Sequence, residues 1–150
     1  MKKYKFSMQK VLDYKEDMQS HEKNILMGMK VKYNTLCDQL DTLKQSYEDC
    51  KAEYEAKCEE GMTITQVIVQ KSYILQLQEK IDLQKELMAK AAAEMEKQVE
   101  KINAITIEKS SIERLKDRNY EEYKALESKE NEIFINEFVI NSASQKEESF

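Results

Sequence analysis

Few residues in this sequence have side chains suited to catalysis or metal binding. The chain holds one histidine, His21, and three cysteines, Cys37, Cys50 and Cys58. No two cysteines form the C-x-x-C pair typical of zinc sites. The chain also lacks a Walker phosphate loop, a G-x-G-x-x-G motif and a G-x-S-x-G motif. We therefore expect no enzyme activity, no metal and no cofactor, and structural cysteines, with redox sensing as the alternative for the thiols.

The composition indicates helices rather than sheets. Pro and Trp are absent, Gly occurs twice, and charged residues make up 35% of the 150 residues. Sheets and phosphate-binding loops need more turn residues than this, whereas long helices do not. The net charge of -5 does not favour nucleic-acid binding. The odd cysteine number and the lack of a long apolar segment predict a cytoplasmic protein without direct membrane insertion.

Apolar residues recur with the heptad spacing of a coiled coil. In the first half of the chain they alternate in steps of four and three: Met29, Tyr33, Leu36, Leu40, Leu43, Tyr47, Cys50 and Tyr54. In the second half one column recurs every seven residues: Ile74, Ile81, Met88, Met95 and Ile102. The companion column contains both apolar and polar members: Leu77, Gln84, Ala91, Gln98, Ile105, Ile112, Asn119, Leu126 and Ile133. This pattern predicts two helices that wind around each other.

One turn is predicted, and it lies between the two halves. Gly61 suits the left-handed residue that ends a helix, and Thr63 with Gln66 fits the capping box that begins the next one. Ser7 is the candidate cap of the first helix. A tight turn makes the helices antiparallel, so residue i lies opposite roughly residue 123 - i.

The predicted fold is all-α, a long antiparallel two-helix coiled-coil hairpin with a C-terminal helical overhang. We expect a single rod over residues 1–150, with helix 1 at about 7–59, a turn at 60–63 and helix 2 at about 64–139. Residues 141–150 are polar, and we expect them to be disordered. Residues after about 120 have no opposite partner in this register. The overhang nevertheless carries apolar side chains at helical spacings: Tyr123, Leu126, Ile133, Phe134 and Phe138.

The seam of the first helix changes phase near Gly28 in this interpretation, because Val11, Met18 and Ile25 keep one register and Met29 begins another. We expect Gly28 to be a packing site opposite about Met95, and a bend or hinge is the alternative.

Positive charge is concentrated where the two ends of the hairpin meet. The basic cluster comprises Lys2, Lys3, Lys5, Lys10, Lys109, Arg114, Lys116 and Arg118. Beyond it the overhang is acidic, with eight glutamates against three lysines after Asn119. The alternatives are ordinary solubilising charge and a surface where the basic cluster docks an acidic partner while the apolar stripe is buried in it.

Two stretches of the chain resemble the flagellar export protein FliJ family. The first is YKFSMQKVLDYKE at residues 4–16, an aromatic start followed by Val-Leu and a charged helix. The second is IERLKDR at residues 112–118, followed by EEY at 121–123 and NEF at 136–138. The length, the glycine turn and the lack of proline also fit this family, and the resemblance covers nearly the whole chain.

The resemblance implies a non-enzymatic, cytoplasmic component of the flagellar type III export apparatus. It implies a monomeric rod, similar to the central stalk of rotary ATPases, that binds the hexameric export ATPase and promotes its activity. It also implies contacts with export chaperones and with the cytoplasmic domain of the membrane export gate, which would hold the protein at the inner face of the cell membrane.

Carried over by position, the resemblance implies two sets of binding residues. The ATPase-binding set is Phe6, Lys10, Arg114, Leu115 and Arg118. The gate-binding set is Tyr73, Leu77, Lys80 and Gln84, of which Leu77 is also a seam position. The rival interpretations are a structural coiled-coil scaffold that pairs through its overhang, a hairpin chaperone that holds unfolded clients, and the stalk of an injectisome.

Overall fold

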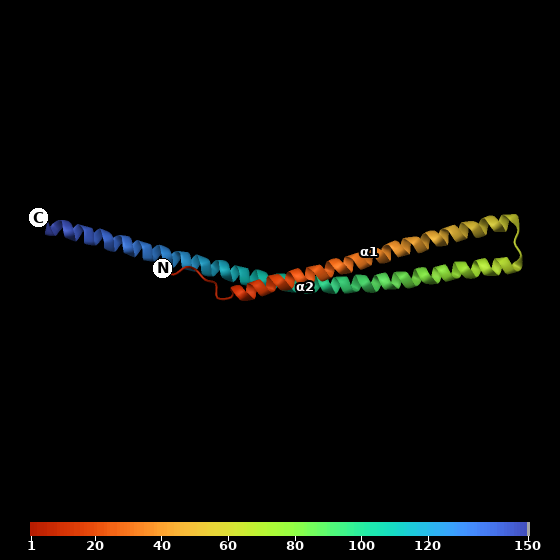
Figure 1. The fold of residues 1–150 in the computed structure, drawn as a ribbon, viewed down its shortest axis with the longest axis horizontal. Coiled ribbons are helices and arrows are strands. Elements are labelled where there is room, and N and C mark those ends of the chain that lie inside the picture. Colours follow the sequence, from red (N-terminus) through yellow and green to blue (C-terminus); the bar gives the residue numbers. More distant parts are fainter. Residues whose placement is uncertain (150) are drawn as a thin grey trace. The chain divides into compact units, whose positions relative to one another are not determined.

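The computed structural model describes residues 1–149 and contains two helices, α1 (Gln9–Glu60) and α2 (Ile64–Glu148) (Figure 1). No strand occurs within these residues. The two helices pack against each other, which confirms the predicted all-α helical hairpin.

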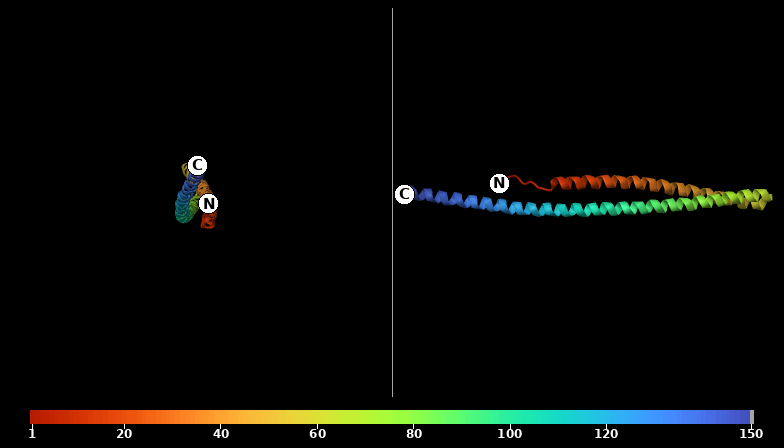
Figure 2. Two further views of the ribbon diagram at one scale, coloured as in Figure 1. Left: turned by 90° about the vertical axis from the view of Figure 1, so that its left-hand side faces the viewer. Right: turned by 90° about the horizontal axis from the view of Figure 1, so that it is seen from below.

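The chain divides into two compact units, which we describe separately. The terminal unit consists of Met1–Gln19 and Ala104–Phe150, and the turn unit consists of Ser20–Asn103. The sequence predicted a single rod over the whole chain. Each unit contains one stretch of α1 and one of α2 (Figure 2).

The turn unit has the seam that the heptad pattern predicted. The α1 positions from Met29 to Tyr54 that recur in steps of four and three are all half-buried or buried. On α2, Leu77 and Ile81 are 4% and 8% exposed, and the polar residues Gln84 and Gln98 of the companion column are buried with them. A narrow core of this kind arises because each helix has only one face to bury.

The predicted register is confirmed within each unit. In the turn unit, residue 84 was expected opposite residue 39, and Gln84 Nε2 donates to Gln39 Oε1 at 3.1 Å. In the terminal unit, residue 108 was expected opposite residue 15, and Lys15 forms an ion pair with Glu108. The turn therefore sets the alignment of the helix pair, because its length determines which residues face each other.

The turn has the predicted local chemistry. Gly61 adopts a φ of 98°, and its N–H donates to the Lys57 carbonyl at 3.0 Å, the left-handed ending of a helix. Gln66 N–H donates to Thr63 Oγ1 at 3.3 Å, and Thr63 N–H donates to Gln66 Oε1 at 3.2 Å. This reciprocal pair is the predicted capping box.

The other helix ends differ from the sequence prediction. α1 begins at Gln9 rather than residue 7, and Ser7 lies in a turn closed by the bond from Gln9 N–H to the Phe6 carbonyl at 3.2 Å. Residues 141–148, which were expected to be disordered, continue α2. Extending a helix costs far less than starting one, and neither Gly nor Pro follows Gly61 to stop it. Phe150, also in the predicted tail, lies outside the described residues.

The predicted change of phase in α1 is wrong. Val11 and Ile25, assigned to the seam, are 40% and 38% exposed, whereas Leu12 is 4% and Glu22 is 7% exposed. The steps of four and three continue towards the N-terminus through polar side chains, Lys15 and Gln19 in the terminal unit and Glu22 in the turn unit. Their polarity hid the heptad, so the neighbouring apolar residues were taken for it.

The packing role expected of Gly28 is also wrong. Gly28 is exposed, and a Cβ added to it would meet no atom within 4 Å. It carries a helical backbone, because Gly61 is the only glycine with positive φ. Gly28 is therefore a helical residue on the outer face of α1, where no neighbouring atom requires a glycine.

We expect Gly28→Ala to raise the free energy of unfolding by about 0.5–1 kcal/mol, because alanine loses less conformational entropy in a helix. The measurement is urea unfolding followed by helical circular dichroism. The matched control, Gly61→Ala, should lower stability by about 1 kcal/mol, because its φ disfavours a side chain. A loss of stability in Gly28→Ala would contradict the assignment.

Candidate functional site

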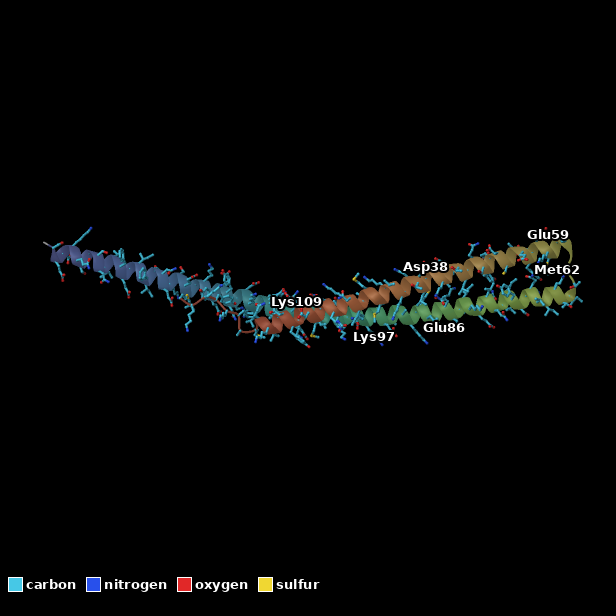
Figure 3. All side chains as sticks on the ribbon, viewed as in Figure 1. Asp38, Glu59, Met62, Glu86, Lys97 and Lys109 are labelled. Carbon is cyan, nitrogen blue, oxygen red and sulfur yellow. The ribbon has the colours of Figure 1, made fainter. Side chains whose placement is uncertain are left out.

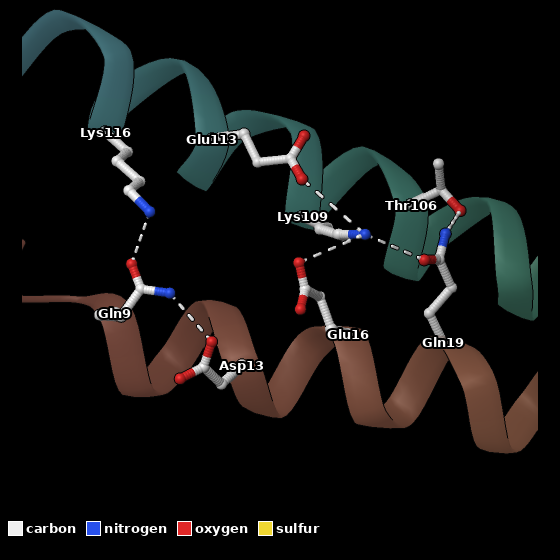
Figure 4. Close-up of polar contacts among 8 residues, drawn as sticks. All are labelled: Gln9, Asp13, Glu16, Gln19, Thr106, Lys109, Glu113 and Lys116. Atoms are coloured by element: carbon white, nitrogen blue, oxygen red, sulfur yellow. Dashed lines mark hydrogen bonds and ion pairs between the residues drawn. The ribbon is translucent and has the colours of Figure 1, made fainter.

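Lys109 of the basic cluster is held by neighbouring side chains in the terminal unit. Its Nζ lies 3.8 Å from carboxylate oxygens of Glu16 and Glu113 and donates to Gln19 Oε1 at 3.3 Å. Gln19 in turn donates to Thr106 Oγ1 at 2.8 Å (Figure 4). Lys109 therefore joins α1 to α2 and is not available to an external partner.

Lys116 is also engaged within the terminal unit. Its Nζ donates to Gln9 Oε1 at 2.8 Å, and the Gln9 amide donates to Asp13 at 2.9 Å (Figure 4). Its main-chain carbonyl accepts a bond from the Tyr4 hydroxyl at 3.2 Å. This lysine fixes the beginning of α1 on α2.

The remaining cations of the basic cluster are exposed and form no ion pair within residues 1–149. They are Lys2, Lys3, Lys5, Lys10, Arg114 and Arg118. Three of them belong to the ATPase-binding set expected from the sequence. Unpaired cations on one unit form a surface suited to anionic groups of a partner.

The two apolar members of that set are placed differently. Phe6 is 8% exposed, and Leu115 is half-buried. Phe6 therefore contributes to packing in the terminal unit, and its ring is not presented to a partner. The sequence could not separate these roles, because the same aromatic residue suits a core and a docking surface.

An apolar stripe on α2 remains exposed beyond the N-terminal residues. Tyr123, which was expected to lack a partner, donates from its hydroxyl to the Lys2 carbonyl at 2.9 Å. The exposed stripe therefore begins after Tyr123. Its members are between 56% and 69% exposed: Leu126, Ile133, Phe134, Phe138 and Ile140. Ile135 and Val139 are also exposed, but they lie towards the opposite face of the helix. A stripe of this size on a helix is typical of an interaction surface.

Two members of the gate-binding set are buried in the seam of the turn unit, and the other two are exposed. Tyr73 is 48% exposed and Lys80 is exposed, but Leu77 and Gln84 are 4% and 8% exposed. Gln84 also donates to the Leu36 carbonyl at 2.9 Å. Only Tyr73 and Lys80 can contact a partner while the helices stay paired.

Charged side chains line the outer faces of the turn unit. Asp38 on α1 and Glu86 and Lys97 on α2 are exposed (Figure 3).

The three cysteines differ in exposure: Cys37 and Cys50 are half-buried, and Cys58 is exposed. Within residues 1–149, no group of three His, Cys, Asp or Glu side chains could hold a metal ion.

The sequence analysis missed a buried carboxylate in the turn unit. Glu22 is 7% exposed; its carboxylate accepts a bond from Gln98 Nε2 and lies 3.1 Å from Lys101 Nζ. Gln98 also donates to the Glu22 carbonyl at 3.0 Å. The bonds from Gln98 and Lys101 lower the pKa of Glu22 below its ordinary value. The heptad step from Leu26 and Met29 back to residue 22 could have revealed this site.

Comparison with known proteins decides the family. The model of the flagellar FliJ protein family matches residues 4–148. The chain belongs to the FliJ family. It is a component of the flagellar type III export apparatus, and this family is non-enzymatic. No curated protein and no solved structure matches the chain.

None of the helices in residues 1–149 is long and apolar enough to cross a membrane. The exposed cations and the exposed stripe both lie in the terminal unit, which contains both stretches that resembled the family.

The buried carboxylate generates a prediction about acid stability. The lowered pKa of Glu22 means that its stabilising contribution is present above the unfolded value of about 4.5 and is lost as the pH falls through the folded value. We expect Glu22→Gln to reduce stability at neutral pH and to flatten the loss of stability in acid. The measurement is urea unfolding at a series of pH values.

The control is Glu86→Gln, which changes an exposed carboxylate on α2 and should leave the pH profile nearly unchanged. Identical acid profiles for Glu22→Gln and the unmodified protein would contradict the assignment of the ion pair.

Proposed function

We propose that this FliJ protein is a stalk that binds the hexameric flagellar export ATPase through its terminal unit and promotes ATP hydrolysis. The single observation that carries the proposal is that two exposed surfaces lie in the same unit. One consists of cations that form no ion pair within the described residues, and the other is the apolar stripe. Cations speed and orient association, and apolar burial supplies affinity. This combination of charge and apolar surface suits docking to a partner rather than catalysis.

The proposed contact residues are Lys10, Arg114 and Arg118, whose charges are exposed. Leu115, which is half-buried, supports them from within the terminal unit, and Phe6 is a packing residue of the same unit. Arg114 and Arg118 lie one turn apart on α2, so they face the same side of the helix. A guanidinium can bind a carboxylate through two parallel bonds, which makes this pair suited to acidic side chains of the ATPase.

The second part of the proposal links the ATPase to the cytoplasmic domain of the export gate and to export chaperones. In the gate-binding set, Tyr73 and Lys80 would contact the gate, and Leu77 and Gln84 would hold the helix pair beneath them. Linking two partners requires a coupling free energy, typically about 1–3 kcal/mol. These contacts would place the protein at the inner face of the cell membrane.

The test is the rate of ATP hydrolysis by the export ATPase of the same organism, with and without this protein. We expect the unmodified protein to raise the rate several-fold and Arg114→Glu with Arg118→Glu to remove the increase, because reversed charges repel the acidic partner. Helical circular dichroism should show that the variant stays folded.

The matched control is Lys85→Glu with Lys90→Glu, which makes the same charge change at exposed positions of α2 in the turn unit. It should stimulate the ATPase normally. Normal stimulation by the Arg114 and Arg118 variant would exclude these arginines from the contact.

The exposed stripe also favours a second candidate, a scaffold that self-associates through residues 126–140. It predicts concentration-dependent dimers in sedimentation and no effect on ATP hydrolysis. A monomer that stimulates the ATPase would exclude it.

A further inference from the structure

The first six residues form a non-helical segment, the N-terminal strap, which lies along α2 beyond the start of α1 (Figure 1). α1 begins at Gln9, so it cannot cover the part of α2 around Tyr123. The strap covers this part instead. It extends the pairing of the helices without being a helix.

Tyrosine side chains hold the strap in place. The Tyr4 ring lies 5.2 Å from the Tyr120 ring and 5.4 Å from the Tyr123 ring, measured between centroids. The Tyr4 hydroxyl donates to the Lys116 carbonyl, and the Tyr123 hydroxyl donates to the Lys2 carbonyl. Phe6 is buried next to this attachment in the chain.

The main chain of the strap contributes little to its own attachment. Within residues 1–149, the only backbone-to-backbone bond outside the helices that involves the strap joins the Phe6 carbonyl to Gln9 N–H at 3.2 Å. Lys2, Lys3 and Lys5 are exposed and form no ion pair within the same residues. A segment held by a few side chains can detach without disturbing a helix.

The position of the strap relates it to the exposed stripe. The heptad columns of α2 pass through Lys116, Asn119 and Tyr123 and continue through Leu126 and Ile133. The first three positions are half-buried, and the last two are 56% and 57% exposed. The strap therefore covers the last part of the heptad face of α2 that has a partner. The same face continues uncovered towards the C-terminus.

We propose that the strap is an autoinhibitory cover, and that partner binding to the α2 stripe displaces it. A segment of the partner that carries aromatic side chains and positive charge takes the place of the strap, and it is distinct from the acidic groups proposed to bind Arg114 and Arg118. The strap itself has this chemistry, KKYKF, and the part of α2 that continues from its attachment carries eight glutamates against three lysines after Asn119. The inference rests on the proposed function, because the partner is the export ATPase.

The test compares Tyr4→Ala with the unmodified full-length protein. This variant loses both ring contacts and the bond to Lys116. In the isolated protein we expect faster tryptic cleavage after Lys3 and Lys5 and faster amide exchange at residues 116–126. With the ATPase we expect half-maximal stimulation at a several-fold lower concentration, because a cover that is already open no longer reduces the fraction competent to bind.

Two further variants make the comparison specific. Tyr4→Phe keeps the ring and loses only the hydroxyl bond, so its effects should lie between those of the unmodified protein and Tyr4→Ala. The matched control is Tyr14→Ala, which truncates a tyrosine that is 61% exposed in the same unit. It should change neither amide exchange at residues 116–126 nor the concentration needed for stimulation.

The outcomes separate this proposal from the proposed function. If the unmodified protein stimulates the ATPase and Tyr4→Ala needs an equal or higher concentration despite faster exchange, the strap is not inhibitory and only this inference fails. If neither protein sediments with the ATPase or stimulates it, the proposed function fails and the inference fails with it. Unchanged exchange and cleavage in Tyr4→Ala would show that Tyr4 does not hold the strap.

Discussion

Both units depend on the burial of one narrow stripe of each helix against the other. A two-helix pair has no third layer, so every apolar residue outside the stripe remains in water. Leu40, Leu77 and Ile102 are buried by this contact, whereas the residues on either side of each of them are exposed. The same constraint explains why α2 has an exposed stripe after Tyr123, because no part of the described chain is left to cover it.

Polar residues in the seam give the helix pair its specificity. Gln84 and Gln98 reach across to main-chain carbonyls of α1 as well as to side chains, and no buried side-chain nitrogen or oxygen in residues 1–149 lacks a partner. A slip by one heptad would leave several of these groups buried without bonds, which is costly. Apolar residues alone would tolerate such a slip more easily. Within the turn unit, the register thus rests on the turn and on these polar contacts together.

The proposed binding roles fall to residues that the pairing of the helices does not use. Leu77 and Gln84 are used to join the helices, so only Tyr73 and Lys80 of that set face outward. In the terminal unit, Lys109 and Lys116 are used in the same way, and Arg114 and Arg118 remain available. The binding surface of such a protein consists of the residues that do not join the two helices. It can therefore be identified only once the residues that join them are known.

The sequence by itself determined the helical hairpin, the turn at Gly61 with its capping box, and the register, because these depend on local chemistry and a period repeated over many residues. Glu22 was overlooked although its heptad position is present in the sequence, whereas the sequence could not place Phe6 or Gly28 or show that Tyr4 reaches Tyr120 and Tyr123. Tertiary structure decided these positions. The physical reason is that polar side chains at seam positions break the apolar pattern, and a non-helical strap has no period to read, so both become visible only when their partners on the other helix are in place.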